Sequence, residues 1–331
     1  MDRADLLTAK TSARRAGMLR TALGPVIGSA LADSTVIEIM ANPDGSLWIE
    51  RLGKDRAREP ERLGAAECER IIRLVASHVG AECHRDSPIV SAELPETGER
   101  FEGLLPPLSS APCFAIRKPA QALFRLSDYV EARILGGAHA NALRLAARDR
   151  RNILIAGGTS SGKTTLANAI LAEIAEAGDR VVILEDTREL ACTAEDVVQL
   201  RTKPGVASLR DLIRSTMRLR PDRIIIGEVR GAEALDLLKA WNTGHPGGIA
   251  TVHANSAEAA LSRLEQLCEE AIPTAPRTLI AEAIDIVVFI ARCAEGRRVE
   301  TILAVDGLSS DGDYLLSPLA APNLALIQPG E

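Results

Sequence analysis

The stretch from Arg151 to Leu171, RNILIAGGTSSGKTTLANAIL, constrains this chain more than any other. A short apolar run, Ile153 to Ala156, leads into a glycine-rich loop, and a helical run follows that loop. The pattern G-x-x-x-x-G-K-T is filled by Gly157, Gly162, Lys163 and Thr164. Because strand, loop and helix stand in the order that a phosphate-binding loop requires, we prefer this interpretation to a glycine-rich connector.

Each residue type in the loop has a chemical reason. Glycines let backbone N–H groups point inward around phosphate oxygens, and the helix N-terminus adds partial positive charge. Lys163 is expected to reach the β- and γ-phosphates of ATP, and the Thr164 hydroxyl to ligate Mg²⁺. The predicted nucleotide-binding residues are Gly157, Gly158, Thr159, Ser160, Ser161, Gly162, Lys163, Thr164 and Thr165.

The second half of the chain alternates strands with helices, which predicts a parallel α/β sheet covered on both faces. Three of its strands end in polar side chains on the side of the phosphate loop, namely Glu185, Glu228 and His253. ATP hydrolysis needs a carboxylate to orient or deprotonate water, and others to hold Mg²⁺ through its waters. Glu185 is therefore also a candidate Mg²⁺ residue, and the sequence leaves open which glutamate is the principal base.

The first half, residues 1 to about 120, predicts a small α+β domain without a nucleotide motif of its own. Arg100 and Arg117 lie on predicted strands there, and taken alone both are more often surface charges than catalytic groups. Pro119 and Gly136-Gly137 bound an apparent connector. The predicted organisation is an N-terminal domain over 1–120, a linker over 121–138 and a phosphate-loop domain over 139–331.

The composition of the chain argues against several classes of protein. Aromatic residues make up only 2% of the chain and the net charge is −6, so strong direct binding to nucleic acid is not expected. No run of 18 apolar residues and no signal-peptide core occur, so we expect a cytoplasmic chain. The predicted helix from Arg3 to Leu31 has an apolar face and a basic excess, typical of a solvated helix or of one that contacts a membrane surface or a partner.

Four ordered motifs resemble those of the secretion traffic ATPases, the superfamily of type II and type IV secretion ATPases and type IV pilus motors. GGTSSGKTT, ILEDTREL, LRPDRIIIGEVRG and GHPGGIATVHANS are similar to its Walker A, Asp, Walker B and His boxes. The stretch from Glu233 to Ala257 resembles the conjugal-transfer ATPases most. One departure is Ser160, where the family usually has Gly; if Ser160 adopts a positive φ, modest strain is expected.

The resemblance implies a RecA-like ATPase domain and a homohexameric ring. It also implies work for a secretion or mating-pair apparatus at the cytoplasmic face of the inner membrane. It further implies that Arg100, in GERFEGLLPP, and Arg117, in FAIRKP, reach the γ-phosphate from the N-terminal domain. Two alternatives stay open at this point: a phosphate-loop DNA motor or helicase, and a nucleotide-gated ring scaffold with little turnover.

Overall fold

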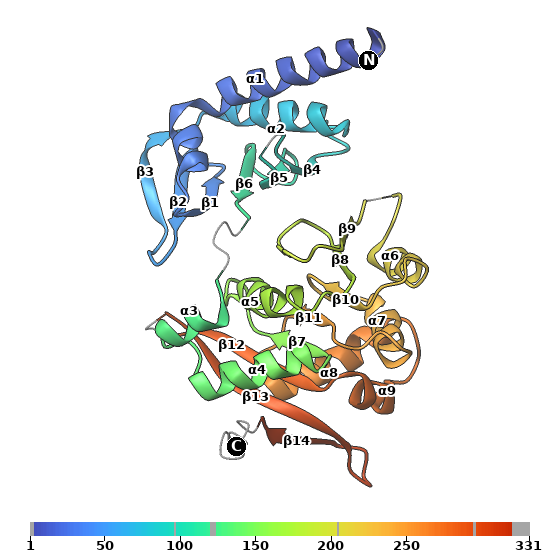
Figure 1. Ribbon diagram of the computed structural model, residues 1–331. Helices are drawn as coiled ribbons and strands as arrows, with labels where there is room; N and C mark the ends of the chain where they lie inside the picture. Colours follow the sequence, from blue (N-terminus) through green and yellow to red (C-terminus); the bar gives the residue numbers. More distant parts are fainter. Residues whose placement is uncertain (1–2, 96, 120–123, 204, 294–295, 320–331) are drawn as a thin grey trace. The chain divides into compact units, whose positions relative to one another are not determined.

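The computed structural model describes residues 3–95, 97–119, 124–203, 205–293 and 296–319 (Figure 1). The chain divides into two compact units, unit 1 over residues 1–121 and unit 2 over residues 122–331. The elements of unit 1 are α1 (Arg3–Ala32), β1 (Val36–Ala41), β2 (Ser46–Arg51), β3 (Ala57–Arg62), α2 (Ala65–Val79), β4 (Ile89–Glu93), β5 (Arg100–Leu104) and β6 (Cys113–Arg117).

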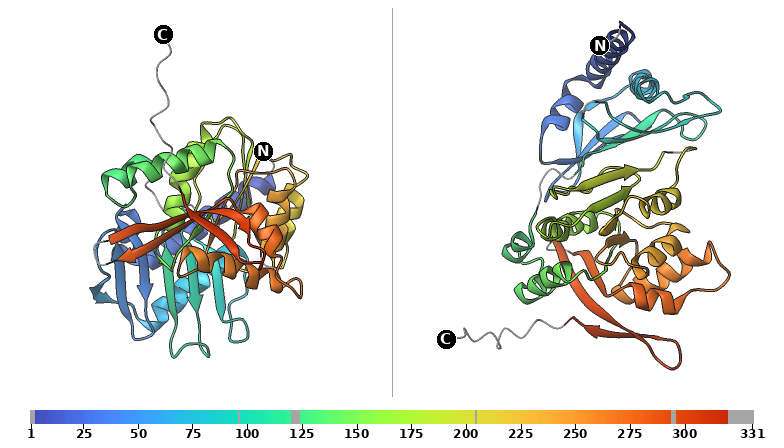
Figure 2. Two further views of the ribbon diagram at one scale, coloured as in Figure 1. Left: turned by 90° about the horizontal axis from the view of Figure 1, so that it is seen from below. Right: turned by 45° about the vertical axis from the view of Figure 1, so that its right-hand side comes forward.

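Unit 1 is an antiparallel sheet with the order β3-β2-β1-β6-β5-β4, and α1 and α2 lie on one face of it (Figure 2). Buried and half-buried residues alternate along β5 and β6, as expected for strands with one covered face. Phe101 and Ile116 are fully buried in the cluster that α2 also enters through Ile72. Arg100 precedes Phe101 in β5, and Arg117 follows Ile116 in β6. Because successive side chains of a strand point to opposite faces, both arginines lie on the face that the helices leave open.

Helix α1 confirms the predicted N-terminal helix, with an interruption that the apolar pattern does not reveal. Gly24 has φ 69° and ψ −179°, and Pro25 follows it within the helix. Proline removes a backbone donor and clashes with the preceding turn, so the helix kinks there. The predicted inward residues Leu19 and Ile27, on either side of the kink, are buried.

Unit 2 contains an eight-stranded sheet of order β14-β13-β12-β7-β11-β10-β8-β9, parallel from β12 to β9, which confirms the predicted parallel α/β core. Its elements are α3 (Leu126–Glu131), α4 (Gly137–Arg148), β7 (Ile153–Ala156), α5 (Lys163–Ala175), β8 (Val181–Glu185), β9 (Val197–Arg201), α6 (Leu209–Thr216), β10 (Arg223–Ile226), α7 (Glu233–Asn242), β11 (Ile249–Val252), α8 (Ala257–Glu269), α9 (Arg277–Ala283), β12 (Ile286–Cys293), β13 (Gly296–Leu308) and β14 (Tyr314–Pro318).

Both faces of this sheet are covered, and the central strands are buried along their whole length. Ile153 and Ile155 of β7 enter the core shared with α3, α4 and α5, whereas Leu154 and Ala156 enter the core shared with α6 to α9. A strand buried on both faces reads as a continuous apolar run, which is why the sequence predicts β7 and β10 clearly.

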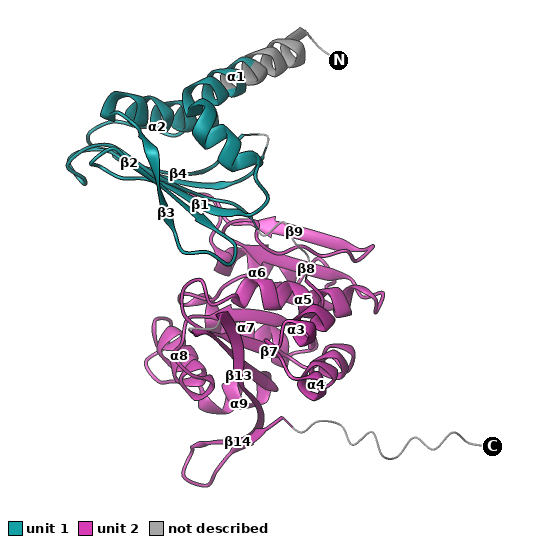
Figure 3. Cartoon of the chain, turned by 90° about the vertical axis from the view of Figure 1, so that its left-hand side faces the viewer, with its two compact units in different colours: residues 1–121 teal, residues 122–331 magenta. Residues whose placement is uncertain are grey.

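The residues predicted as a linker are not all a connector. Leu126, Tyr129 and Leu135 are buried in the same core as α4 and α5. Helix α3 and Leu135 therefore belong to unit 2, which begins after residue 121 (Figure 3). Residues 120–123 lie outside the described part of the chain.

Candidate functional site

The loop between β7 and α5 has the geometry that the sequence predicts for a phosphate-binding loop. A Cβ at Gly157 would lie 2.3 Å from the Ile290 carbonyl oxygen, so only glycine fits beside β12. Gly162, the residue before α5, has φ 101°, which side chains rarely adopt. Ser160, at the position where the family usually has Gly, has φ 58°, so the condition under which we expect modest strain is met. The loop thus requires glycine at two of its pattern positions and holds Ser160 in the left-handed region.

Lys163, the first residue of α5, turns its ammonium group back over the mouth of the loop. Its Nζ donates to the carbonyl oxygens of Gly157 and Gly158, both at 2.9 Å, and the side chain is buried. The same Nζ lies 3.4 Å from Nδ1 and 3.5 Å from Nε2 of His253, at the end of β11. The lysine and the histidine therefore meet at the carboxyl edge of the sheet, where open α/β sheets bind ligands.

Thr164, the predicted Mg²⁺ ligand, is joined to Glu185 through a residue that the sequence reasoning missed. The Thr164 hydroxyl donates to Glu189 Oε2 at 3.1 Å, and the Glu189 amide donates to Glu185 Oε1 at 2.9 Å. Glu189 lies inside the Asp-box stretch, but nothing in its spacing distinguishes it from a surface glutamate. One hydroxyl and two carboxylates form an all-oxygen set, which fits Mg²⁺, an ion that takes few protein ligands and keeps water and phosphate in its remaining positions.

Glu185 at the end of β8 is only 3% exposed, and its environment changes its acidity. Burial raises its pKa to about 7, while the backbone N–H groups of Glu189 and Leu190 that donate to it act in the opposite direction. Gly227 lies directly against this side chain, since a Cβ there would meet Glu185 Cγ at 3.0 Å. The glycine before Glu228 therefore leaves room for the buried carboxyl group.

Glu228 follows β10 and stands in a different environment from Glu185. Its side chain is 18% exposed, but its Oε1 is buried, has no hydrogen-bond partner among the described residues and lies 2.9 Å from Nε2 of His253. Its other oxygen accepts a hydrogen bond from Arg230, which also lies 3.6 Å from Asp186. Arg230 is a second contact that the sequence reasoning did not single out, although it lies in the Walker-B-like stretch. The order Lys163, His253, Glu228 connects the loop to a carboxylate with one oxygen that has no hydrogen-bond partner among the described residues.

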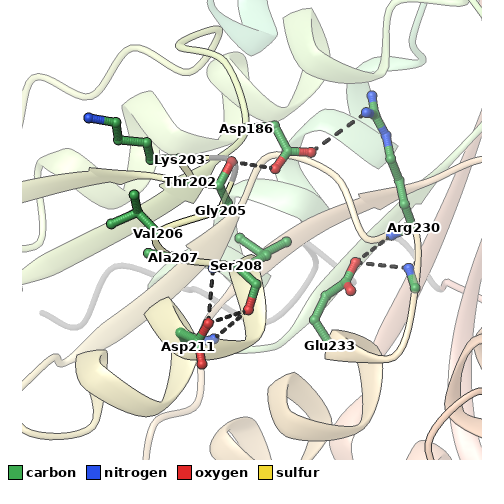
Figure 4. A pocket seen from close by; sticks show the side chains of 12 residues that line it. Asp186, Thr202, Lys203, Gly205, Val206, Ala207, Ser208, Asp211, Arg230 and Glu233 are labelled. Atoms are coloured by element: carbon green, nitrogen blue, oxygen red, sulfur yellow. Dashed lines mark hydrogen bonds and ion pairs between the residues drawn. The ribbon is translucent and has the colours of Figure 1, made fainter. Parts of the chain in front are cut away.

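A pocket opens beside Arg230, at the carboxyl edge of β8 and β9 (Figure 4). Asp186, Thr202 and Arg230 line one side of it, and the capped start of α6 with Ser208 and Asp211 lines the other. Its polar groups bond largely to one another: Thr202 donates to Asp186, and Ser208 to Asp211. Because these polar groups already bond to one another, we interpret the pocket as part of the local structure at the sheet edge and not as a separate binding site.

Arg100 and Arg117 are direct neighbours in unit 1, a relation that their separation in sequence conceals. They face each other across β5 and β6, and the same lateral row continues to Glu38 on β1 and Glu93 on β4. Like charges directly opposite each other are destabilising, and the flanking carboxylates offset this cost. Burial raises the pKa of Glu38, and Arg117 opposes that shift.

The predicted site residues thus fall into two groups. Those of unit 2, from the loop to Glu185, Glu228 and His253, come together at one edge of the sheet. The two arginines come together on the open face of the unit 1 sheet. His245, by contrast, precedes β11 and contacts the Pro221 carbonyl oxygen at 2.9 Å, at the strand starts opposite the loop. No helix in the described ranges is long and apolar enough to cross a membrane.

Comparison with known proteins places these features in a family. The family model described as "Type II/IV secretion system protein" matches residues 26–312. Conjugal transfer protein TrbB of Rhizobium radiobacter is 52% identical over 291 residues, which cover 87% of this chain and 90% of that protein. Type IV secretion system protein PtlH of Bordetella pertussis is 35% identical, with 84% and 93% covered.

A solved structure supports the fold. The X-ray structure of the Legionella pneumophila ATPase DotB matches with a TM-score of 0.57 and 20% identity, over 86% of this chain and 76% of that one. At this identity the likeness concerns the fold alone, and it agrees with an α/β ATPase fold.

Proposed function

The chain belongs to the family of type II/IV secretion system proteins, and we propose that it is the ATP-hydrolysing motor of a conjugal-transfer machine of the type IV secretion class. The observation that carries the proposal is the joined set of Lys163, His253 and Glu228 at the mouth of the phosphate loop. The relatives with the names given above, similar over most of the chain, support the conjugal role.

In this proposal the loop from Gly157 to Gly162 cradles the phosphates of ATP with its backbone N–H groups. Lys163 exchanges its bonds to the loop carbonyls for bonds to the β- and γ-phosphates. Thr164, Glu189 and Glu185 hold Mg²⁺, directly or through its waters. The ion neutralises phosphate charge in such sites.

Glu228 is the better candidate for the residue that orients or deprotonates the attacking water. Its Oε1 has no hydrogen-bond partner among the described residues, whereas Glu185 is 3% exposed and has one oxygen engaged by two backbone N–H groups. His253 lies between Glu228 and Lys163, so its position depends on whether the lysine engages a phosphate. We therefore propose that His253 senses the γ-phosphate and relays its loss, and its contacts with Lys163 and Glu228 support this role.

Arg100 and Arg117 supply positive charge from unit 1 to the γ-phosphate in the proposed cycle. Two adjacent guanidinium groups can stabilise the negative charge of the γ-phosphate, and this interaction ends when the γ-phosphate leaves after hydrolysis. ATP then draws the units together and phosphate release lets them separate, which converts turnover into movement. The adjacent carboxylates of Glu38 and Glu93 reduce the repulsion between the two guanidinium groups within unit 1.

We further propose that the protein acts as a homohexameric ring on the cytoplasmic face of the inner membrane. There it works with the inner-membrane components of the mating-pair apparatus. The family match and the names of its relatives support work with such an apparatus, and the ring is what the resemblance of the four motifs implies. The basic N-terminal helix α1 is the proposed contact with the membrane surface.

The experiment that tests the proposal is the Lys163→Ala substitution. Loss of the point charge at the β- and γ-phosphates removes transition-state stabilisation, so hydrolysis and conjugal transfer should both be abolished. Lys239→Ala, at an exposed position on α7, is the matched control and should keep both. Wild-type turnover by folded Lys163→Ala protein would remove the phosphate loop from the reaction. Turnover that rises strongly with single-stranded DNA would favour a DNA motor instead.

A further inference from the structure

Arg297, the second residue of β13, lies against the phosphate loop. Its Nε donates to the carbonyl oxygen of Ser160 at 3.4 Å. Its aliphatic stem passes over Gly162, where an added Cβ would meet Arg297 Cδ at 2.9 Å. Gly162 therefore accommodates this side chain as well as a positive φ, and the guanidinium is brought to the edge of the loop.

The backbone that carries Arg297 is fixed at several points. β13 pairs with β12 along its length, and the Ile290 carbonyl of β12 abuts Gly157 in the loop. On the other side, the Val299 amide donates to the Ile134 carbonyl at 2.9 Å. The arginine is thus presented to the loop by a strand whose position is set from both flanks.

The charge of Arg297 is not neutralised within the described residues. None of their carboxylates lies within ion-pair distance of its guanidinium, although the side chain is half-buried. Its direct cross-strand neighbour is Arg292, another cation. A partly desolvated cation beside a phosphate-binding loop points to an anionic ligand.

The order of strands decides which part of a nucleotide Arg297 can meet. β7, which leads into the loop, has β11 and β10 on one side and β12 and β13 on the other. His253 and Glu228 follow β11 and β10, so the groups for hydrolysis lie on the first side. Arg297 approaches from the second side, away from the place where the γ-phosphate is cleaved.

We propose that Arg297 is a nucleotide-binding residue that contacts the α- or β-phosphate, the part of the phosphate chain that ATP and ADP share. This inference rests on the proposed function of the loop and adds a residue to it from a strand outside the four motifs. Arg297 would therefore contact phosphates that remain after hydrolysis, whereas Arg100 and Arg117 are proposed to act on the γ-phosphate alone.

The test compares Arg297→Gln with Arg298→Gln, the adjacent exposed arginine of the same strand, which faces Ala291 instead of the loop's neighbour Arg292. Affinity is measured by calorimetry for Mg²⁺-ADP and for the non-hydrolysable Mg²⁺-β,γ-imido-ATP. Loss of a charge-assisted bond should weaken both nucleotides by a similar factor, about 10- to 100-fold. KM for ATP should rise by a similar factor while kcat changes little, and Arg297→Lys should recover part of the affinity. Arg298→Gln should match the wild type.

Three results would overturn the inference. Unchanged affinity for both nucleotides would do so, as would a loss for the ATP analogue alone, which would place Arg297 at the γ-phosphate. A lowered melting temperature of the nucleotide-free Arg297→Gln protein with normal ADP affinity would show a structural role only. Failure of the wild-type protein to bind either nucleotide would instead refute the proposed function, so the two failures can be told apart.

Discussion

Replacing Glu185 by glutamine should stabilise unit 2 at alkaline pH and leave its stability almost unchanged at acidic pH. Burial raises the pKa of this carboxyl group from 4.5 to about 7. A group with a raised folded pKa contributes stability that is fully present below its unfolded pKa and is lost as pH rises through its folded pKa. For Glu185 that window lies between about pH 4.5 and pH 7.

The magnitude follows from the size of the shift. The two values differ by about 2.5 units, and one unit corresponds to about 1.4 kcal/mol, so the ionised side chain costs about 3 kcal/mol at pH 8. Glutamine keeps the shape and an oxygen that can accept from the Glu189 and Leu190 amides, but it does not ionise. The difference in unfolding free energy between Glu185→Gln and wild type should therefore rise by about 3 kcal/mol from pH 4.5 to pH 8.

Urea unfolding in EDTA gives this difference, because EDTA removes Mg²⁺ that would stabilise the carboxylate. The chain has two tryptophans, Trp48 in unit 1 and Trp241, which is 2% exposed in unit 2. A Trp48→Phe background leaves Trp241 fluorescence as a probe of unit 2 alone. Glu131→Gln, at an exposed position on α3, is the matched control. A difference that stays constant with pH within about 0.5 kcal/mol would refute the reasoning.

Two further predictions concern the arginine pair and the loop. Arg100→Ala and Arg117→Ala should each lower kcat by up to about 10³-fold, because each removes a guanidinium charge that stabilises the γ-phosphate, and ADP affinity should stay the same. ATPase assays and calorimetry check this prediction, and normal rates in both variants would exclude a closing movement of unit 1. Gly157→Ala should destabilise the protein by about 1–3 kcal/mol, because its Cβ would lie 2.3 Å from the Ile290 carbonyl oxygen. A Cβ at Gly158 would meet nothing within 4 Å, so Gly158→Ala should have the melting temperature of the wild type. Equal melting temperatures for all three proteins would contradict the loop geometry.

The phosphate loop and the parallel core could be predicted from sequence because their signals are local. The loop is a contiguous motif, and β7 and β10 are apolar runs buried on both faces. The ends of parallel strands meet at one edge of a sheet, so the polar residues after β8, β10 and β11 could be grouped from strand order alone. Glu185, Glu228 and His253 were predicted in this way to lie at one edge, and their roles stay predictions.

Relations that depend on register could not be predicted. Arg100 and Arg117 are direct cross-strand neighbours only because β5 pairs with β6 in one register. Strand β3 carries mostly charged residues and is exposed along the sheet edge, so it has no apolar alternation to detect. Strand β14 pairs with β13 in a region whose sequence is weakly patterned.

The remaining omissions are residues whose importance comes from a partner distant in sequence. Glu189 joins Thr164 to Glu185, and Arg297 reaches Ser160 across 137 positions of the chain. Neither belongs to a spacing pattern, because the contacts arise from how β8 and β13 lie beside the loop. Sequence therefore identifies the residues that a motif requires, and the structure adds those that the fold brings to it.

The measurement that tests the central claim most directly is the ATPase activity of Glu228→Gln together with its affinity for ATP. The amide keeps the shape of the side chain and loses the charge that orients or deprotonates water. We predict that the variant binds Mg²⁺-ATP with nearly wild-type affinity and hydrolyses it about 10²- to 10⁴-fold more slowly. Turnover within a factor of two of the wild-type rate would contradict the account and remove Glu228 from the role of base.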